Sequence, residues 1–262
     1  MQRKNKIIKN KKAQITIFVI IAIVLVVSIA LIFIFVQKPS IKISPENPGT
    51  IKSYIEKCAR DATEEAEKLV IPQGGFLEPS SYLLYNDTKV AWLCYTPFNE
   101  QLCSNRHPML NKEIEKEIEN YIKPKIEDCF NDIKTKLKNY DYKEELLSID
   151  VEILSKNIYV NMTKKITYTK YDRTISLENF DAQIKSPVYD FIRLATEIVN
   201  QEVSCDCTRE TCNADVIALN RLNRDFEISR FVTGRNEKIY TIKDILTNKK
   251  FNFAVRNCVR LP

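Results

Sequence analysis

An uncharged apolar run of 22 residues, Ile15–Val36, constrains this chain more than any other feature. Only Thr16 and Ser28 carry polar side chains in the run, and both hydroxyls can bond back to a helix carbonyl. At a rise of about 1.5 Å per residue, the run would form a helix of roughly 33 Å, enough to cross the hydrocarbon core of a bilayer. The run therefore predicts a transmembrane helix over 15–36, with a lipid bilayer as its partner.

Positive charge is concentrated before this run. Residues 1–14 hold six basic side chains and no acidic one, which accounts for the whole formal charge of +6. The positive-inside rule places this leader in the cytoplasm and the C-terminal part outside, as in a single-pass protein of the cell membrane. The remaining basic and acidic side chains cancel, so the soluble part lacks the basic excess that nucleic-acid binding requires.

The cysteines agree with an extracytoplasmic location. All eight follow the apolar run, and an even number in an oxidising compartment indicates a disulfide framework. Cys58 and Cys129 each lie on the apolar stripe of a predicted helix, just after a Tyr-Ile pair, so two packed helices could join them. Cys94 and Cys103 flank a short loop that a second disulfide would close.

The other four cysteines leave two interpretations open. Cys205, Cys207 and Cys212 form a Cys-x-Cys-x4-Cys cluster, and Cys258 supplies a fourth thiol. Four thiols would suffice for zinc, but the usual Cys-x2-Cys spacing is missing, which favours two disulfides. Cys205 and Cys207 are too close in sequence to bond each other readily, so each should reach another partner.

The boundary KNKKAQITIFVIIAIVLVV resembles the class III signal peptide of archaeal prepilins. In such a leader a dedicated peptidase cuts before the apolar helix, here between Ala13 and Gln14, and the helix stays as the anchor. Two features depart from pilins. The fifth mature position is Phe18 where pilins have Glu, and Pro39 would end the helix early. The alternative is an uncleaved signal anchor.

A wider resemblance is to uncharacterised single-pass membrane proteins of small-genome archaea. It is carried by the start AQITIF and by the segments IEKCARDATEEAEKLVIPQGGF and YTIKDILTNKKFNFAVRN. The resemblance implies a membrane-anchored protein with an exported domain, and it implies no particular activity.

Hydrophobic periodicity predicts the elements of the soluble part. Apolar residues at three- and four-residue spacing predict helices over 50–70, 110–137 and 187–203, with Pro124 kinking the second. Alternating or β-branched segments predict a hairpin over 82–95 and strands over 147–154, 158–162, 166–170, 173–184, 226–233, 238–242 and 251–256.

The predicted fold class is α+β, with an N-terminal transmembrane helix followed by an ectodomain of amphipathic helices packed on antiparallel β-sheet. The predicted parts are a cytoplasmic leader (1–14), the transmembrane helix (15–36), a Pro-containing linker (37–49), a helical subdomain with a β-hairpin (50–145), and a β-rich subdomain with one long helix and the Cys cluster (146–262).

Residues suited to catalysis are scarce. His107 is the only histidine, which leaves no second histidine for a metal site, and there is no glycine-rich phosphate loop. We therefore expect no cofactor and a non-enzymatic structural or interaction role at the cell envelope, with envelope proteins as possible partners. The alternatives are a pilin-like subunit of a surface appendage or secretion system, and an exported hydrolase that uses two carboxylates.

Overall fold

The computed structural model describes residues 20–28, 46–207, 213–235 and 237–259. The chain divides into two compact units, Met1–Lys42 and Ile43–Pro262. In the first unit residues 20–28 are helical. No helix among the described residues is long and apolar enough to cross a membrane. The transmembrane helix of the predicted fold class is therefore wrong as a description of this structure.

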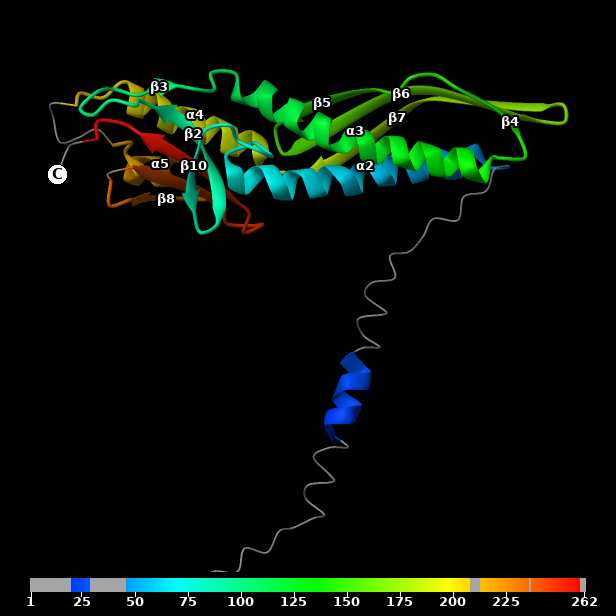
Figure 1. Ribbon diagram of the computed structural model, residues 1–262, viewed down its shortest axis with the longest axis horizontal. Helices are drawn as coiled ribbons and strands as arrows, with labels where there is room; N and C mark the ends of the chain where they lie inside the picture. Colours follow the sequence, from blue (N-terminus) through cyan, green and yellow to red (C-terminus); the bar gives the residue numbers. More distant parts are fainter. Residues whose placement is uncertain (1–19, 29–45, 208–212, 236, 260–262) are drawn as a thin grey trace, which may run out of the picture. The chain divides into compact units, whose positions relative to one another are not determined.

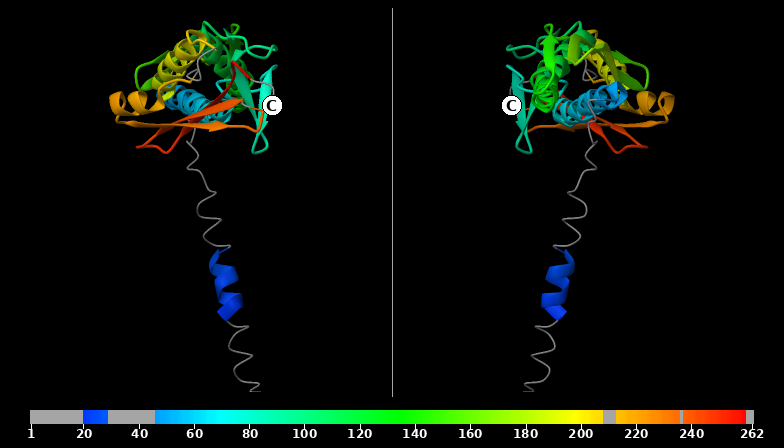
Figure 2. Two further views of the ribbon diagram at one scale, coloured as in Figure 1. Left: turned by 90° about the vertical axis from the view of Figure 1, so that its left-hand side faces the viewer. Right: turned by 90° about the vertical axis from the view of Figure 1, so that its right-hand side faces the viewer.

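Two long antiparallel helices form the centre of the second unit. Helix α2 (Pro48–Val70) begins at Asn47, whose side-chain oxygen accepts a hydrogen bond from the Gly49 amide at 3.0 Å. Helix α3 (Leu110–Lys136) continues through Pro124. Each helix buries one apolar stripe, as the periodicity predicts, and the two lie side by side (Figure 1). The end-on views show α2 in the middle of the unit (Figure 2).

A four-stranded antiparallel sheet covers these helices. Strand β6 (Asn157–Lys170) pairs with β7 (Arg173–Lys185) on one side, and with β4 (Asp141–Glu144) and β5 (Ser148–Leu154) on the other. The strands predicted over 158–162 and 166–170 are thus one strand, with a register irregularity between Thr163 and Ile166. Helix α2 packs on β7, and α3 packs on β5.

A second sheet is mixed rather than antiparallel. Its order is β1–β2–β10–β9–β8, with β3 paired to β2, and its strands are β1 (Tyr82–Tyr85), β2 (Thr88–Tyr95), β3 (Ser104–Asn105), β8 (Phe226–Val232), β9 (Lys238–Asp244) and β10 (Lys250–Arg256). Strands β2 and β10 pair in parallel, which corrects the antiparallel sheet of the predicted fold class. Because these strands lie far apart in the chain, no hairpin forces them to run in opposite directions.

Shorter elements complete the unit: the 3-10 turn η1 (Ile71–Gln73), α4 (Val188–Val203) and α5 (Val216–Leu222). Helix α4 contacts α3 and strands of both sheets. One continuous hydrophobic core draws side chains from both sides of residue 146. For example, Phe130 of α3 meets Phe180 of β7 edge to face, with ring centroids 5.3 Å apart. The two halves of residues 43–262 therefore fold around a shared interior.

Candidate functional site

Disulfide bonds, predicted from the number and placement of the cysteines, are confirmed. Cys58 bonds Cys129 and so joins α2 to α3, and Cys94 bonds Cys103 across the loop between β2 and β3. Cys207 bonds Cys258, which ties the segment after α4 to the residues after β10. These bonds link the helix pair, one loop and the C-terminal strand.

The Cys cluster is engaged in disulfides at each position that the structure describes. Cys205 is also disulfide-bonded, and its sulfur lies 3.9 Å from that of Cys258. Cys212 lies outside the described residues, as do Ala13 and Gln14 of the predicted cleavage site. Since Cys207 and Cys258 are bonded to each other, their sulfurs are not thiolates available to zinc. Within the described ranges, no group of three His, Cys, Asp or Glu could hold a metal ion.

His107 has a structural environment. Its Nδ1 lies 2.5 Å from a carboxylate oxygen of Glu113, in the first turn of α3, and its ring packs on Phe76 with centroids 4.5 Å apart. These contacts hold the loop before α3 against the segment that follows η1.

The most deeply buried charge in the described fold is Glu202, near the end of α4. Its side chain is fully buried and accepts hydrogen bonds from Lys238 at 2.6 Å, from the Asn257 side chain at 3.1 Å and from the Tyr240 hydroxyl. Burial is the main cause that raises the pKa of Tyr240 and lowers the pKa of Lys238. The cluster joins α4 to β9 and the residue after β10.

A cavity of about 480 Å³ places three aspartates together, Asp190, Asp225 and Asp244. Asp244 accepts hydrogen bonds from the Leu246 and Thr247 amides and from the Thr247 hydroxyl, so it caps its own turn. Asp190 lies 3.7 Å from Arg193 one turn along α4. Two of the three carboxylates thus have local partners within the fold.

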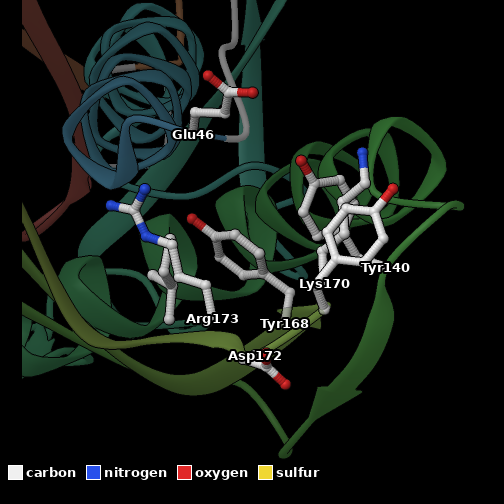
Figure 3. A pocket seen from close by; sticks show the side chains of 8 residues that line it. Glu46, Tyr140, Tyr168, Lys170, Asp172 and Arg173 are labelled. Carbon is white, nitrogen blue, oxygen red and sulfur yellow. The ribbon is translucent and has the colours of Figure 1, made fainter.

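A second cavity, which we call the tyrosine pocket, lies where four segments meet. The residue before the α2 cap, the turn after α3, the end of β6 and the start of β7 all contribute to it. It has a volume of about 460 Å³ and is lined by Glu46, Tyr140, Tyr168, Lys170, Tyr171, Asp172, Arg173 and Ile175 (Figure 3).

Tyr168 carries the unusual feature of this pocket. Its side chain is 1% exposed, and within the described structure its hydroxyl has no hydrogen-bond partner. The hydroxyl points toward Arg173 (Figure 3), yet the two groups make no hydrogen bond. Burial, and next the neighbouring Tyr140, raise the pKa of Tyr168, while Arg173 opposes this shift. The phenol therefore stays protonated at neutral pH and has a hydrogen to donate. An unmade bond of a buried hydroxyl costs about 1–3 kcal/mol.

The walls of the tyrosine pocket combine aromatic rings with charges of both signs. The Lys170 ammonium lies 5.0 Å from the centroid of the Tyr140 ring and 5.8 Å from that of Tyr171. Arg173 is exposed and, among the described residues, has no ion-pair partner. Glu46 and Asp172 bring carboxylates to the same lining. The pocket can therefore donate to an anion at one wall and accept from hydroxyls at another.

The β6–β7 turn adds a strained aromatic residue. Tyr171 is 89% exposed, and its φ of 54° lies in the left-handed region that glycine or asparagine usually occupies in such turns. A tyrosine there costs of order 1 kcal/mol and, at that exposure, contributes little to the core.

Sequence reasoning did not identify this pocket. Its residues come from segments separated by more than 90 positions, between Glu46 and Tyr140. One local signal was present: Tyr171-Asp172 joins two strands where a Gly- or Asn-containing turn would be expected.

The comparisons with known proteins add no relative: no protein-family model, no curated protein and no solved structure matches this chain.

Proposed function

We propose that this chain is a disulfide-braced extracytoplasmic protein with an interaction role at the cell envelope, and that it holds its ligand at the tyrosine pocket. In this account the protein recognises a partner and leaves it chemically unchanged. The location of residues 1–14 in the cytoplasm and the contact of residues 15–36 with a bilayer stay predictions from the sequence.

The disulfides support the proposed extracytoplasmic location. Seven of the eight cysteines lie in the described residues, and all seven are disulfide-bonded. Such bonds persist in oxidising compartments and are reduced in most cytosols. They also brace the fold, for example between α2 and α3.

The observation that carries the interaction role is the buried hydroxyl of Tyr168, which has no hydrogen-bond partner in the part of the chain that the structure describes. Native folds satisfy nearly all buried polar groups, so an orphan beside an open cavity needs an explanation. A bound ligand that accepts the hydrogen bond would supply one. The neighbouring Arg173 and Lys170, which enter no ion pair with another described residue, support the same account.

Two measurements test the proposal. The first is the intact mass of the full chain from its native cells, with thiols alkylated before and after reduction. We expect no alkylated thiol before reduction and eight afterwards. Eight free thiols before reduction would overturn the proposed extracytoplasmic location. The second is a ligand screen by thermal unfolding. We expect a ligand that raises the unfolding temperature of the wild type and has much less effect on Tyr168→Phe. Stabilisation that is equal in both proteins for every ligand found would overturn the role of the pocket.

A further inference from the structure

We infer that the tyrosine pocket binds a sugar that carries one carboxylate, with that carboxylate held between the Tyr168 hydroxyl and Arg173. This inference rests on the proposed interaction role and names the ligand class. The juxtaposition that carries it is a buried donor, a guanidinium with no ion-pair partner among the described residues, and aromatic walls in one cavity.

The buried end of the pocket calls for a hydrogen-bond acceptor. A protonated phenol offers one hydrogen, and within the described chain nothing accepts it from Tyr168. The flanking side chains, Arg173 and Glu46, are both exposed and can turn to admit a ligand group. Of these two only the arginine attracts an anion, so the acceptor belongs on the arginine side of the hydroxyl, where Figure 3 shows Tyr168 pointing.

A carboxylate fits this position better than a phosphate. A guanidinium binds either group through paired hydrogen bonds. The lining, however, holds two cations, Lys170 and Arg173, and two carboxylates, Glu46 and Asp172. Because these charges balance, a monoanion meets less repulsion from the two acidic side chains than a dianion does.

The rest of the lining suits a sugar ring. The rings of Tyr140 and Tyr171, together with Ile175, offer apolar faces against which the C–H face of a pyranose can pack. Glu46 and Asp172 accept hydrogen bonds from hydroxyls, and Lys170 donates to them. A purely apolar carboxylate would leave these charged groups without a partner and desolvated. A volume of about 460 Å³ is in the range of small-molecule sites.

The turn supports this assignment. Tyr171 holds a left-handed conformation at a φ of 54° while almost fully exposed, so its side chain adds little to the stability of the free fold. The same side chain lines the tyrosine pocket, where it can pack against a bound ligand.

The test uses three probes that differ only at the sixth carbon: D-glucuronate, D-glucose and D-glucose 6-phosphate. Each is titrated into the full-length oxidised protein, and the dissociation constant is obtained from ligand-observed NMR. We expect glucuronate to bind at least about tenfold more tightly than glucose, and more tightly than the phosphate. Tyr168→Phe and Arg173→Gln should each weaken glucuronate binding about tenfold.

Tyr159→Phe is the matched control. Tyr159 lies on the same strand as Tyr168, outside the pocket lining, and its hydroxyl accepts from Gln183 at 3.3 Å. This variant should bind glucuronate as the wild type does.

Other outcomes overturn the inference in distinguishable ways. If glucose and glucuronate bind equally and Tyr168→Phe still weakens both, the pocket does not recognise the carboxylate. The proposed interaction role would then still stand. Tightest binding of the 6-phosphate would assign the pocket to phosphorylated ligands. Binding of none of the three probes would exclude this sugar class, and the thiol measurement and the ligand screen would then judge the proposed function separately. Equal loss in Tyr159→Phe would place the binding site elsewhere.

Discussion

The rings of Tyr140 and Tyr168 meet edge to face, with centroids 5.7 Å apart and planes inclined by 79°. This contact joins the turn after α3 to the last residues of β6 and holds the Tyr168 ring in place. The ring is thus anchored by packing, while its hydroxyl is left without a partner in the described fold. Because the ring packs in the fold and the hydroxyl makes no hydrogen bond to the described residues, removing the hydroxyl alone gives a direct test of the tyrosine pocket.

The two disulfides of the helix pair and the β2–β3 loop should contribute unequally to stability. They close segments with sequence separations of 71 and 9 residues. In the chain-entropy model, removing the longer link costs about 4 kcal/mol and the shorter about 2.5 kcal/mol. Denaturant unfolding of Cys58→Ala/Cys129→Ala and of Cys94→Ala/Cys103→Ala measures this difference. A larger loss for the Cys94–Cys103 pair would contradict the expected order.

The buried ion pair should be intolerant of losing its cation. Lys238→Met leaves Glu202 buried without its ammonium partner at 2.6 Å, and breaking such a pair costs about 3–5 kcal/mol. Lys243→Met is the control on the same strand, because Lys243 meets the exposed Glu227 at 3.4 Å, a contact worth at most about 1 kcal/mol. Similar free energies of unfolding for the two variants would show that the Lys238–Glu202 pair contributes no more to stability than the exposed pair.

Stability at alkaline pH should reflect Tyr54. Burial, and then its hydrogen bond to Asp132, raise the pKa of Tyr54 to about 12, whereas an unfolded tyrosine titrates near 10. Since the folded state keeps the proton more tightly, this contribution is complete below pH 10 and is lost as the pH rises toward 12. The stability advantage of the wild type over Tyr54→Phe should therefore shrink between pH 10 and 12 in thermal unfolding experiments. An advantage that grows over this window would reverse the assigned sign.

The helices and strands with strong periodicity could be predicted from sequence. The apolar stripe Ile114, Ile118, Ile122 and Ile126 repeats every four residues, and all four side chains are fully buried in α3. The hairpin turn at Asn86-Asp87 follows from residues that tolerate positive φ, and both adopt it. These features depend on neighbours in sequence, which is why local patterns identify them.

Long-range pairing could not be predicted in the same way. Nothing in the Trp92 segment indicates that it runs parallel to the Ala254 segment, because strand direction across so long a connection depends on the packing of the whole unit. The apolar run over 15–36 shows a different limit. Hydropathy predicted a membrane span, while no helix among the described residues is long and apolar enough to cross a membrane.

The tyrosine pocket was beyond sequence analysis for a related reason. Tyr140, Tyr168 and Glu46 look like ordinary surface or sheet residues when each is read alone. They become a site only because the start of α2, the end of α3 and the β6–β7 hairpin meet at one end of the unit (Figure 1). The missing hydrogen bond of Tyr168 is a property of that meeting point and of no single segment.

The free energy of unfolding of Tyr168→Phe, measured without ligand, tests the central claim most directly. If the hydroxyl serves a ligand rather than the fold, removing it should leave stability unchanged or raise it by about 1 kcal/mol, because a buried unsatisfied group is lost. Tyr159 lies on the same strand, and its hydroxyl accepts a hydrogen bond from Gln183. The variant Tyr159→Phe therefore gives the reference for the loss of an ordinary phenol hydroxyl. A loss of more than about 1 kcal/mol in Tyr168→Phe, beyond that of Tyr159→Phe, would show that the hydroxyl has a structural partner and would contradict the account.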